Sequence, residues 1–261
     1  MEDAVEKFAI FGGVSWGKID TKKPTFELIK KLILDDYSYI RNDITELTDG
    51  QPLYHSILSA IALSDGKAHA VYKRARVEDG VGQKAIETLL ERRIIRLKRC
   101  KGADDKFIFT LPFLRFWFAF VSPLFKGVRD GDYKEVEARW SAYESEFPQQ
   151  IFKELSQLLV RDTLKEESIM DIGEYWQNDG LEIDIYAKTK DKKIIIGTCK
   201  YSNSKIKKSE IAKLEELSSR ANLNNDIKVI VAKKGFSKEL KALKSPSIRL
   251  LTLKNFKTLV E

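Results

Sequence analysis

The chain has 261 residues, of which 43% are apolar and 33% are charged, and its formal net charge at pH 7 is +7. This composition excludes a disordered tail protein and leaves enough chain for one large domain or two small ones. No stretch approaches the roughly 18 consecutive apolar residues that a membrane span needs, so we expect a soluble protein that does not enter a membrane.

The amino terminus and the rare residues indicate a cellular location and limit the chemistry. The first residues are acidic where a secretory signal is basic, and the two cysteines lie far apart in the chain, which favours the reducing cytoplasm. The chain has only two histidines, so most histidine-based metal sites and acid–base schemes are excluded. Any catalysis must therefore depend on carboxylates and lysines.

The net charge is unevenly distributed along the chain. Residues 52–111 carry 12 basic and 7 acidic side chains, and residues 186–261 carry 19 and 7. The remaining segments, 1–51 and 112–185, are net acidic. Clustered lysine and arginine attract phosphate backbones, so the two basic segments predict two surfaces for a polyanion. For the last segment, a lysine-rich surface that only solubilises the protein is the alternative.

Helical spacing of apolar residues dominates the first part of the chain. Pro24 and the apolar residues after it predict a helical lead-in over residues 1–50. Beyond a turn around Gly50, three further helices are predicted, and their ranges are residues 53–62, 68–75 and 81–91.

Two β-like runs follow these helices, Ile94 to Leu97 and Phe107 to Leu111, and the charged turn Lys101 to Asp105 joins them. Three helices followed by a β-hairpin is the element order of a winged helix, which we expect over residues 51–111. A winged helix docks its third helix on DNA and uses the hairpin as a wing.

The predicted winged helix carries many basic residues that could contact DNA. The exposed side of its third helix is expected to present Gln83, Lys84 and Thr88. The basic residues expected to bind nucleic acid are Lys73, Arg74, Arg76, Lys84, Arg92, Arg93, Arg96 and Arg99. The alternative is a winged helix that docks on another protein.

Residues 112–165 are predicted to form a helical connector that ends in the first helix of the next domain. The run PFLRFWFAFVSPLF at 112–125 is too apolar to stay exposed and predicts a packing helix between domains. A polar, acidic helix is expected from Tyr133 to Val160, with a kink or break at Pro148.

From Ile169 onward, short β-rich runs alternate with helices. Strands are predicted over residues 170–176, 182–187, 193–199, 228–232 and 248–251, and helices over 208–221, 237–243 and 254–260. We therefore expect an α/β domain with a mixed sheet over residues 166–261, in a chain that is α+β overall.

One run resembles a nucleotide-binding motif only in its spacing. The run GGVSWGK, Gly12 to Lys18, has Walker A spacing, but Ile19 follows where the motif needs a serine or threonine for magnesium. We expect no nucleotide site there.

A carboxylate pair in the α/β domain is the stronger candidate site. Strand alternation puts Glu182 and Asp184 on one face of their strand, and Thr198 and Lys200 on one face of the next. A short turn joins the two strands, so they are expected to pair as a hairpin. Carboxylates can hold Mg²⁺ beside a scissile phosphate, and a lysine can stabilise the developing charge. A surface ion pair is the alternative.

The run LEIDIYAKTKDKKIIIGTCKYS, residues 181–202, resembles the core hairpin of PD-(D/E)XK nucleases. More closely, nearly the whole chain resembles the winged-helix plus nuclease-like region at the carboxyl end of archaeal-type ATPases, a domain of unknown function. The stretches LYHSILSAIALSDGK, LRFWFAFV and IGEYWQNDGLEIDIYAK carry this likeness. The ATPase portion is absent, so the resemblance implies a standalone version, with a separately encoded ATPase as a possible partner.

The resemblance implies a restriction-endonuclease-like fold, with Asp184 as metal ligand and Lys200 as catalytic lysine. The chain departs from the family pattern at two places. Thr198 stands where the family has a second acid, and Lys153 follows Phe152 where the family usually has an acid. Glu182 could partly restore the charge as a second metal ligand. We therefore expect a weakened or absent Mg²⁺ site.

The resulting hypothesis is a cytoplasmic DNA-binding protein with a winged helix and a degenerate nuclease-like domain. The first alternative is an active Mg²⁺-dependent DNA endonuclease that uses Asp184, Glu182 and Lys200. The second is a protein-interaction module that partners a separate ATPase.

Overall fold

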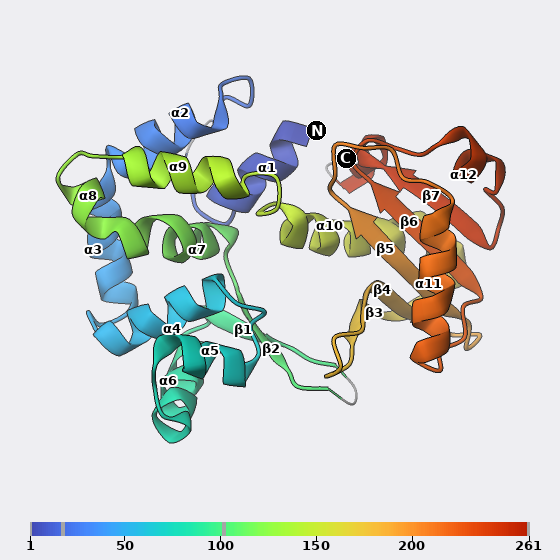
Figure 1. Cartoon of the computed structure of the whole chain (residues 1–261), viewed down its shortest axis with the longest axis horizontal. Coiled ribbons are helices and arrows are strands. Elements are labelled where there is room, and N and C mark those ends of the chain that lie inside the picture. The colour runs from blue at the N-terminus through green and yellow to red at the C-terminus, as the bar shows by residue number, and fades with distance from the viewer. Residues whose placement is uncertain (1, 17–18, 101–102, 260–261) are drawn as a thin grey trace. The chain divides into compact units, whose positions relative to one another are not determined.

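The computed structural model describes residues 2–16, 19–100 and 103–259 (Figure 1). Two residues of the Walker-like run, Gly17 and Lys18, lie outside the described residues, as do Lys101 and Gly102 of the predicted wing turn and Val260 of the predicted terminal helix. Within the described part, the fold is a mixed α+β structure with twelve α-helices, a two-stranded sheet and a five-stranded sheet.

The chain divides into two compact units. The helical unit is Glu6–Arg99 with Asp104–Glu144. The sheet unit consists of the described residues of Met1–Val5, Cys100–Ala103 and Ser145–Glu261. The predicted lead-in and the predicted winged-helix segment thus lie mainly in the helical unit, and the predicted α/β domain lies in the sheet unit.

The helical unit begins within α1 (Glu2–Phe11), which lies in the predicted helical lead-in over residues 1–50. Its other α-helices are α2 (Thr25–Ile29), α3 (Tyr37–Leu47), α4 (Pro52–Ala62), α5 (Ala68–Ala75), α6 (Asp79–Glu91), α7 (Pro112–Phe116), α8 (Phe125–Arg129) and α9 (Lys134–Tyr143). Strands β1 (Ile95–Lys98) and β2 (Lys106–Phe109) pair antiparallel, with Ile95 opposite Phe109. The predicted order of three helices followed by a β-hairpin is therefore present as α4, α5, α6, β1 and β2.

Close packing of α5 against α6 requires a glycine. A Cβ atom built on Gly82 of α6 would lie 2.5 Å from the ring of Tyr72 on α5, so any larger residue would separate the two helices. Both Gly82 and Tyr72 are buried. This contact fixes the ends of α5 and α6, where several of the predicted DNA-binding residues lie.

The aromatic run after Pro112 is largely buried, as predicted, but it packs inside the helical unit and not between domains. Helix α7 continues through the π-helical turn Trp117–Val121, and every side chain of that turn is buried. The ring of Phe118 stacks on Phe109 of β2, and Phe120 packs edge-on against Trp140 of α9. The aromatic cluster thereby joins the hairpin, α7 and α9 within the helical unit.

The sheet unit contains a mixed sheet in the order β3-β4-β5-β6-β7. The strands are β3 (Ile169–Trp176), β4 (Glu182–Thr189), β5 (Ile194–Lys200), β6 (Ile227–Ala232) and β7 (Ile248–Thr252), and the helices are α10 (Gln149–Thr163), α11 (Ser209–Arg220) and α12 (Lys238–Ala242). The first three strands pair antiparallel, and β5, β6 and β7 pair parallel. The predicted mixed sheet is confirmed.

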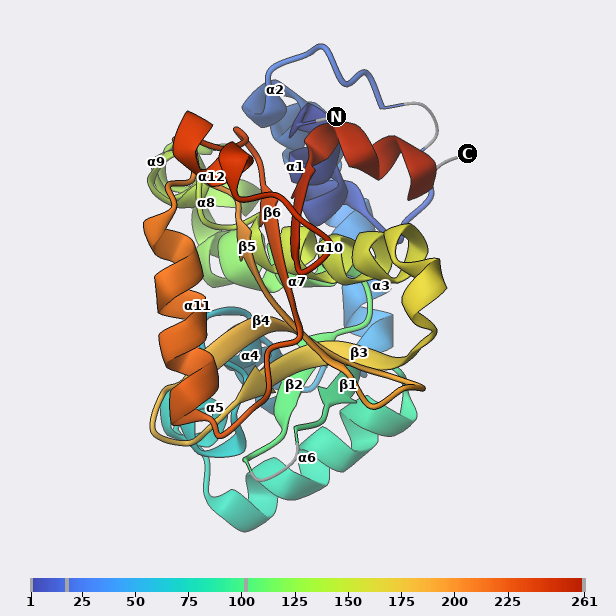
Figure 2. The ribbon, with the colours of Figure 1, turned by 90° about the vertical axis from the view of Figure 1, so that its right-hand side faces the viewer.

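Helices α10 and α11 cover opposite sides of this sheet (Figure 2). Pro148 is the residue before α10, so it starts a new helix after α9 ends and does not kink a continuous one. The last residues form a 3-10 helix, Leu253–Leu259, which packs on α10. Phe152 of α10 is fully buried and stacks on Phe256 of this segment. In the part of the chain that the structure describes, no helix is long and apolar enough to cross a membrane.

Candidate functional site

A β-bulge places Asp184. In the β3–β4 pair, Gly173 lies opposite Tyr186 and Tyr175 opposite Ile183, so two residues of β4, Asp184 and Ile185, stand opposite the single residue between them on β3. A bulge of this kind bends its strand and changes the direction of a side chain. As a result, the Asp184 side chain contacts α10.

The partner of Asp184 on α10 is Lys153. The Lys153 Nζ atom lies 2.6 Å from Asp184 Oδ1, and only 19% and 14% of the two side chains are exposed. Burial of the ammonium lowers the pKa of Lys153, but the carboxylates of Asp184, Glu174 and Glu182 raise it by more. The net effect is a raised pKa, so the ammonium stays charged throughout the neutral range.

The second oxygen of Asp184 is also occupied. Its Oδ2 atom accepts hydrogen bonds from the Thr198 hydroxyl at 3.0 Å and from the Cys199 backbone N–H at 2.8 Å. Both donors come from β5, so a single carboxylate connects β4, β5 and α10. Thr198, which stands at the position of the expected second acid, therefore serves as a hydrogen-bond donor to Asp184.

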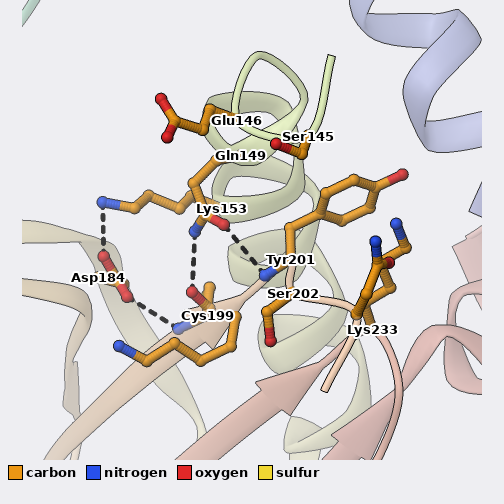
Figure 3. A pocket seen from close by; sticks show the side chains of 11 residues that line it. Ser145, Glu146, Gln149, Lys153, Asp184, Cys199, Tyr201, Ser202 and Lys233 are labelled. Atoms are coloured by element: carbon orange, nitrogen blue, oxygen red, sulfur yellow. Dashed lines mark hydrogen bonds and ion pairs between the residues drawn. The ribbon is translucent and has the colours of Figure 1, made fainter. Parts of the chain in front are cut away.

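Two glutamines extend this contact along α10. The Gln149 side chain donates to the Cys199 carbonyl at 2.8 Å and accepts from the Tyr201 N–H at 3.0 Å (Figure 3). The Gln157 side chain donates to the Asp184 carbonyl at 2.8 Å. Residues 149, 153 and 157 are spaced by four and therefore share one face of the helix. We call them the polar stripe of α10.

Lys200 lies near Asp184 but pairs with a different residue. The Lys200 Nζ atom lies 2.9 Å from Glu210 Oε1 at the start of α11. Lys200 and Asp184 nevertheless line the same cavity, of about 650 Å³, together with Lys153, Tyr201 and Lys233 (Figure 3). The structure thus places Thr198 against Asp184 and places Lys200 on the same cavity, but the lysine bonded to Asp184 is Lys153.

The residues around Asp184 do not fit a divalent cation. Among the described residues, no three His, Cys, Asp or Glu side chains are placed to hold a metal ion. Mg²⁺ requires oxygen ligands in a nearly octahedral arrangement, whereas Asp184 binds an ammonium, a hydroxyl and an amide. Glu182 is exposed and contributes to the charge around Lys153. The donor set around Asp184 therefore supports no metal-dependent step.

The thiol beside this site is buried in the sheet. Cys199 is 1% exposed. Burial raises the pKa of its thiol well above the usual value, and the Asp184 carboxylate raises it further. A protonated, buried thiol is a poor nucleophile, in agreement with the expected core role.

Lysines gather at the edge of the sheet where β5 and β6 end. The loops after these strands run side by side, because Ile206 accepts from the Ser237 N–H and donates to the Gly235 carbonyl, at 2.9 Å each. Ile206 and Phe236 are buried, while the lysines around them reach the surface. We call this set the lysine edge, and its members are Lys205, Lys207, Lys208, Lys233, Lys234 and Lys238.

The lysine edge adds to the lowering of one neighbouring carboxyl pKa, that of Glu239. A hydrogen bond from the Ser237 side chain lowers the pKa of Glu239, and the charges of Lys208 and Lys207 lower it further. The edge adjoins the cavity, since Lys233 lines it and lies over the Tyr201 ring at 4.1 Å from its centroid.

In the helical unit, all eight predicted nucleic-acid-binding side chains are exposed. They lie at three places in the fold. Lys73, Arg74 and Arg76 are at the end of α5, Lys84, Arg92 and Arg93 are on α6 and just after it, and Arg96 and Arg99 are on β1 and just after it. Arg92 forms an ion pair with Asp49.

The exposed side of α6 is more acidic than the prediction assumed. Gln83 donates to Glu87 at 3.1 Å, and the hydroxyl of Thr88 donates to the Lys84 carbonyl at 3.2 Å. The exposed charged residues of α6 are Asp79, Lys84, Glu87 and Glu91. Three of these four are acids, and two of the three expected reading side chains are already bonded within the helix.

The sequence contained signals for the residues that the prediction missed. The spacing of Gln149, Lys153 and Gln157 indicates one helix face, and Lys153 occupies the position where an acid is usual in the resembled family. The runs KIKK and KKGFSK follow two predicted strands, and the loops after parallel strands meet at one edge of a sheet.

The comparison with protein families found a match in the central part of the chain. No curated protein and no solved structure matches the chain. One family model matches, DUF234, described as archaea bacterial proteins of unknown function, over residues 117–214. The matched stretch contains Lys153, Asp184, Thr198 and Lys200, so the candidate site lies within the region in which this chain is similar to a family of unknown function.

Proposed function

We propose that the protein binds duplex DNA through phosphate contacts and does not cleave it. The helical unit is proposed to contain a winged helix, and the sheet unit a degenerate PD-(D/E)XK-like fold. The observation that carries the proposal is the exposure of all eight predicted basic side chains on α5, α6 and β1. Exposed lysine and arginine bind phosphates by releasing condensed counterions.

The binding is proposed to be independent of base sequence. Glu87 and Glu91 on the exposed side of α6 would approach the phosphates of both strands if this helix entered a major groove. Base readout also needs free donors and acceptors, whereas Gln83 is bonded to Glu87. The helix ends and the hairpin, where the basic residues lie, are better suited to backbone contacts.

The first test removes three basic side chains of the helical unit. The variant Arg93→Asn, Arg96→Gln, Arg99→Gln should bind any duplex at least about tenfold more weakly at 0.1 M salt, and its salt slope should fall by about 3. Asparagine is chosen because Arg93 has a positive φ of 56°, which asparagine tolerates. Affinity is measured by fluorescence anisotropy with two duplexes of unrelated sequence.

The matched control is Lys22→Gln, Lys23→Gln, Lys31→Gln, which removes three exposed charges from the lead-in. It should keep the wild-type affinity. Equal losses in both variants would indicate only a net-charge effect, and an unchanged arginine variant would contradict the proposed winged-helix surface.

The lysine edge is proposed to be a second phosphate-binding surface. Lys207→Gln with Lys208→Gln should lower the salt slope of duplex binding by about 2, since each lost phosphate contact lowers it by about 1. Lys188→Gln with Lys190→Gln removes the same charge near the β4–β5 turn, at the other end of β5, and should leave the slope unchanged. If both double variants change the salt slope equally, the lysine edge is not a specific phosphate-binding surface.

A further inference from the structure

We propose that the Lys153 ammonium is the resident cation of a carboxylate site, in the place that a divalent metal ion would otherwise take. This inference concerns the sheet unit alone and does not depend on DNA binding.

The contacts of Lys153 support this assignment. Its ammonium lies 2.6 Å from Asp184 Oδ1, and the carboxylates of Glu174 and Glu182 add to the negative charge around it. These acids come from β3 and β4, and Asp184 itself is brought to α10 by the bulge. The single positive charge of Lys153 thus offsets negative charge from acids on both β3 and β4.

An ammonium and a divalent ion satisfy such a site differently. The ammonium donates up to three hydrogen bonds and needs no fixed ligand geometry, whereas Mg²⁺ or Mn²⁺ requires several oxygens converging on one point. Here Asp184 contacts the lysine, and among the described residues no three acidic, histidine or cysteine side chains are placed to hold an ion. Lys153 must leave before an ion can bind Asp184.

The neighbours of Lys153 on α10 hold it in this position. Phe152 is fully buried, and Gln149 and Gln157, one turn before and one turn after Lys153, are bonded to the backbone of β4 and β5. The helix therefore presents position 153 to Asp184 whatever side chain it carries. Replacing the lysine by an acid should convert the site from an ion pair to a cation-binding group.

The test compares Mn²⁺ binding by the full chain and by Lys153→Glu, using calorimetry and the thermal midpoint in EDTA and in Mn²⁺. Lys153→Glu should bind Mn²⁺ at least about tenfold more tightly than the wild type, and its midpoint should rise with Mn²⁺. The wild-type midpoint should not change. Lys213→Glu makes the same charge reversal at an exposed position of α11 and should gain no affinity.

Two results would overturn the inference. One is wild-type Mn²⁺ binding that Asp184→Asn abolishes, because the ion would then bind beside the lysine. The other is a failure of both Lys153→Glu and Lys153→Ala to gain affinity. If Lys153→Glu is unfolded in EDTA, recovery of its native circular dichroism with Mn²⁺ supports the inference, and no recovery contradicts it.

Discussion

Asp184→Asn is expected to lower the free energy of unfolding by about 3 kcal/mol, measured by urea denaturation. Asparagine preserves the shape of the side chain and an oxygen for the Thr198 and Cys199 donors, but it removes the charge that faces Lys153. An ammonium that is 19% exposed is then left without its closest counterion. Glu174 and Glu182 still contribute negative charge around Lys153. The expected loss in free energy of unfolding is therefore at the lower end of the range for broken buried ion pairs.

The double variant Lys153→Met, Asp184→Asn should recover at least half of that loss, because no buried charge then remains unpaired. Asp179→Asn is the matched control. Asp179 pairs with Arg220 where both side chains are more than half exposed, so its loss should be small. An Asp184→Asn variant as stable as this control would contradict a structural ion pair.

The same pair predicts how the effect depends on pH. The pKa of Lys153 is raised in the folded protein, so the ammonium stabilises the fold fully below its unfolded pKa of about 10.4. That contribution is lost only as the pH rises through the folded pKa. The difference in the free energy of unfolding between wild type and Asp184→Asn should therefore be the same at about pH 6.5 and at about pH 8.5.

Phe152→Ala is expected to have the other large effect, a loss of about 3 to 5 kcal/mol in the same denaturation experiment. Phe152 is fully buried, and its ring packs on Tyr201 and stacks on Phe256. Its removal leaves a cavity between α10 and the terminal 3-10 segment. Because the neighbouring residue is Lys153, loosening α10 should also weaken the Asp184 pair.

Leu158→Ala on the same helix is the control, because Leu158 is 51% exposed. The variant should cost less than about 1 kcal/mol. Alanine is the best helix former, so helix propensity cannot cause a loss in either variant. Comparable losses in the two variants would contradict the aromatic contact as the source of the effect.

The sequence predicts the elements of the sheet unit well because each strand and helix has its own apolar pattern. All five predicted strands are present, with their ends shifted by a residue or two. Helix α1 lies within the predicted lead-in over residues 1–50, but the apolar pattern behind that prediction begins only at Pro24, so the pattern does not predict the bounds of α1. Alternation alone cannot locate the bulge at Asp184, because an extra residue depends on the partner strand.

The candidate site is predicted only in part, for a related reason. Asp184, Thr198 and Lys200 lie on paired strands, and a strand pattern is enough to group them. The partner of Asp184 comes from a helix more than thirty residues earlier in the chain, and no local pattern connects Lys153 to it. Lys200 faces α11 through Glu210, a contact that depends on where the crossover helix begins.

The polar stripe of α10 also determines the position of the helix on the sheet. Apolar contacts are nearly indifferent to a small slide or rotation, since one buried methyl group substitutes for another. Gln149 and Gln157 make directional hydrogen bonds to backbone atoms of β5 and β4, and Lys153 pairs with the Asp184 carboxylate. A slide by one residue would break all three contacts together. These three side chains thus define one register of α10 on the sheet, and the buried packing of Phe152 holds the helix there.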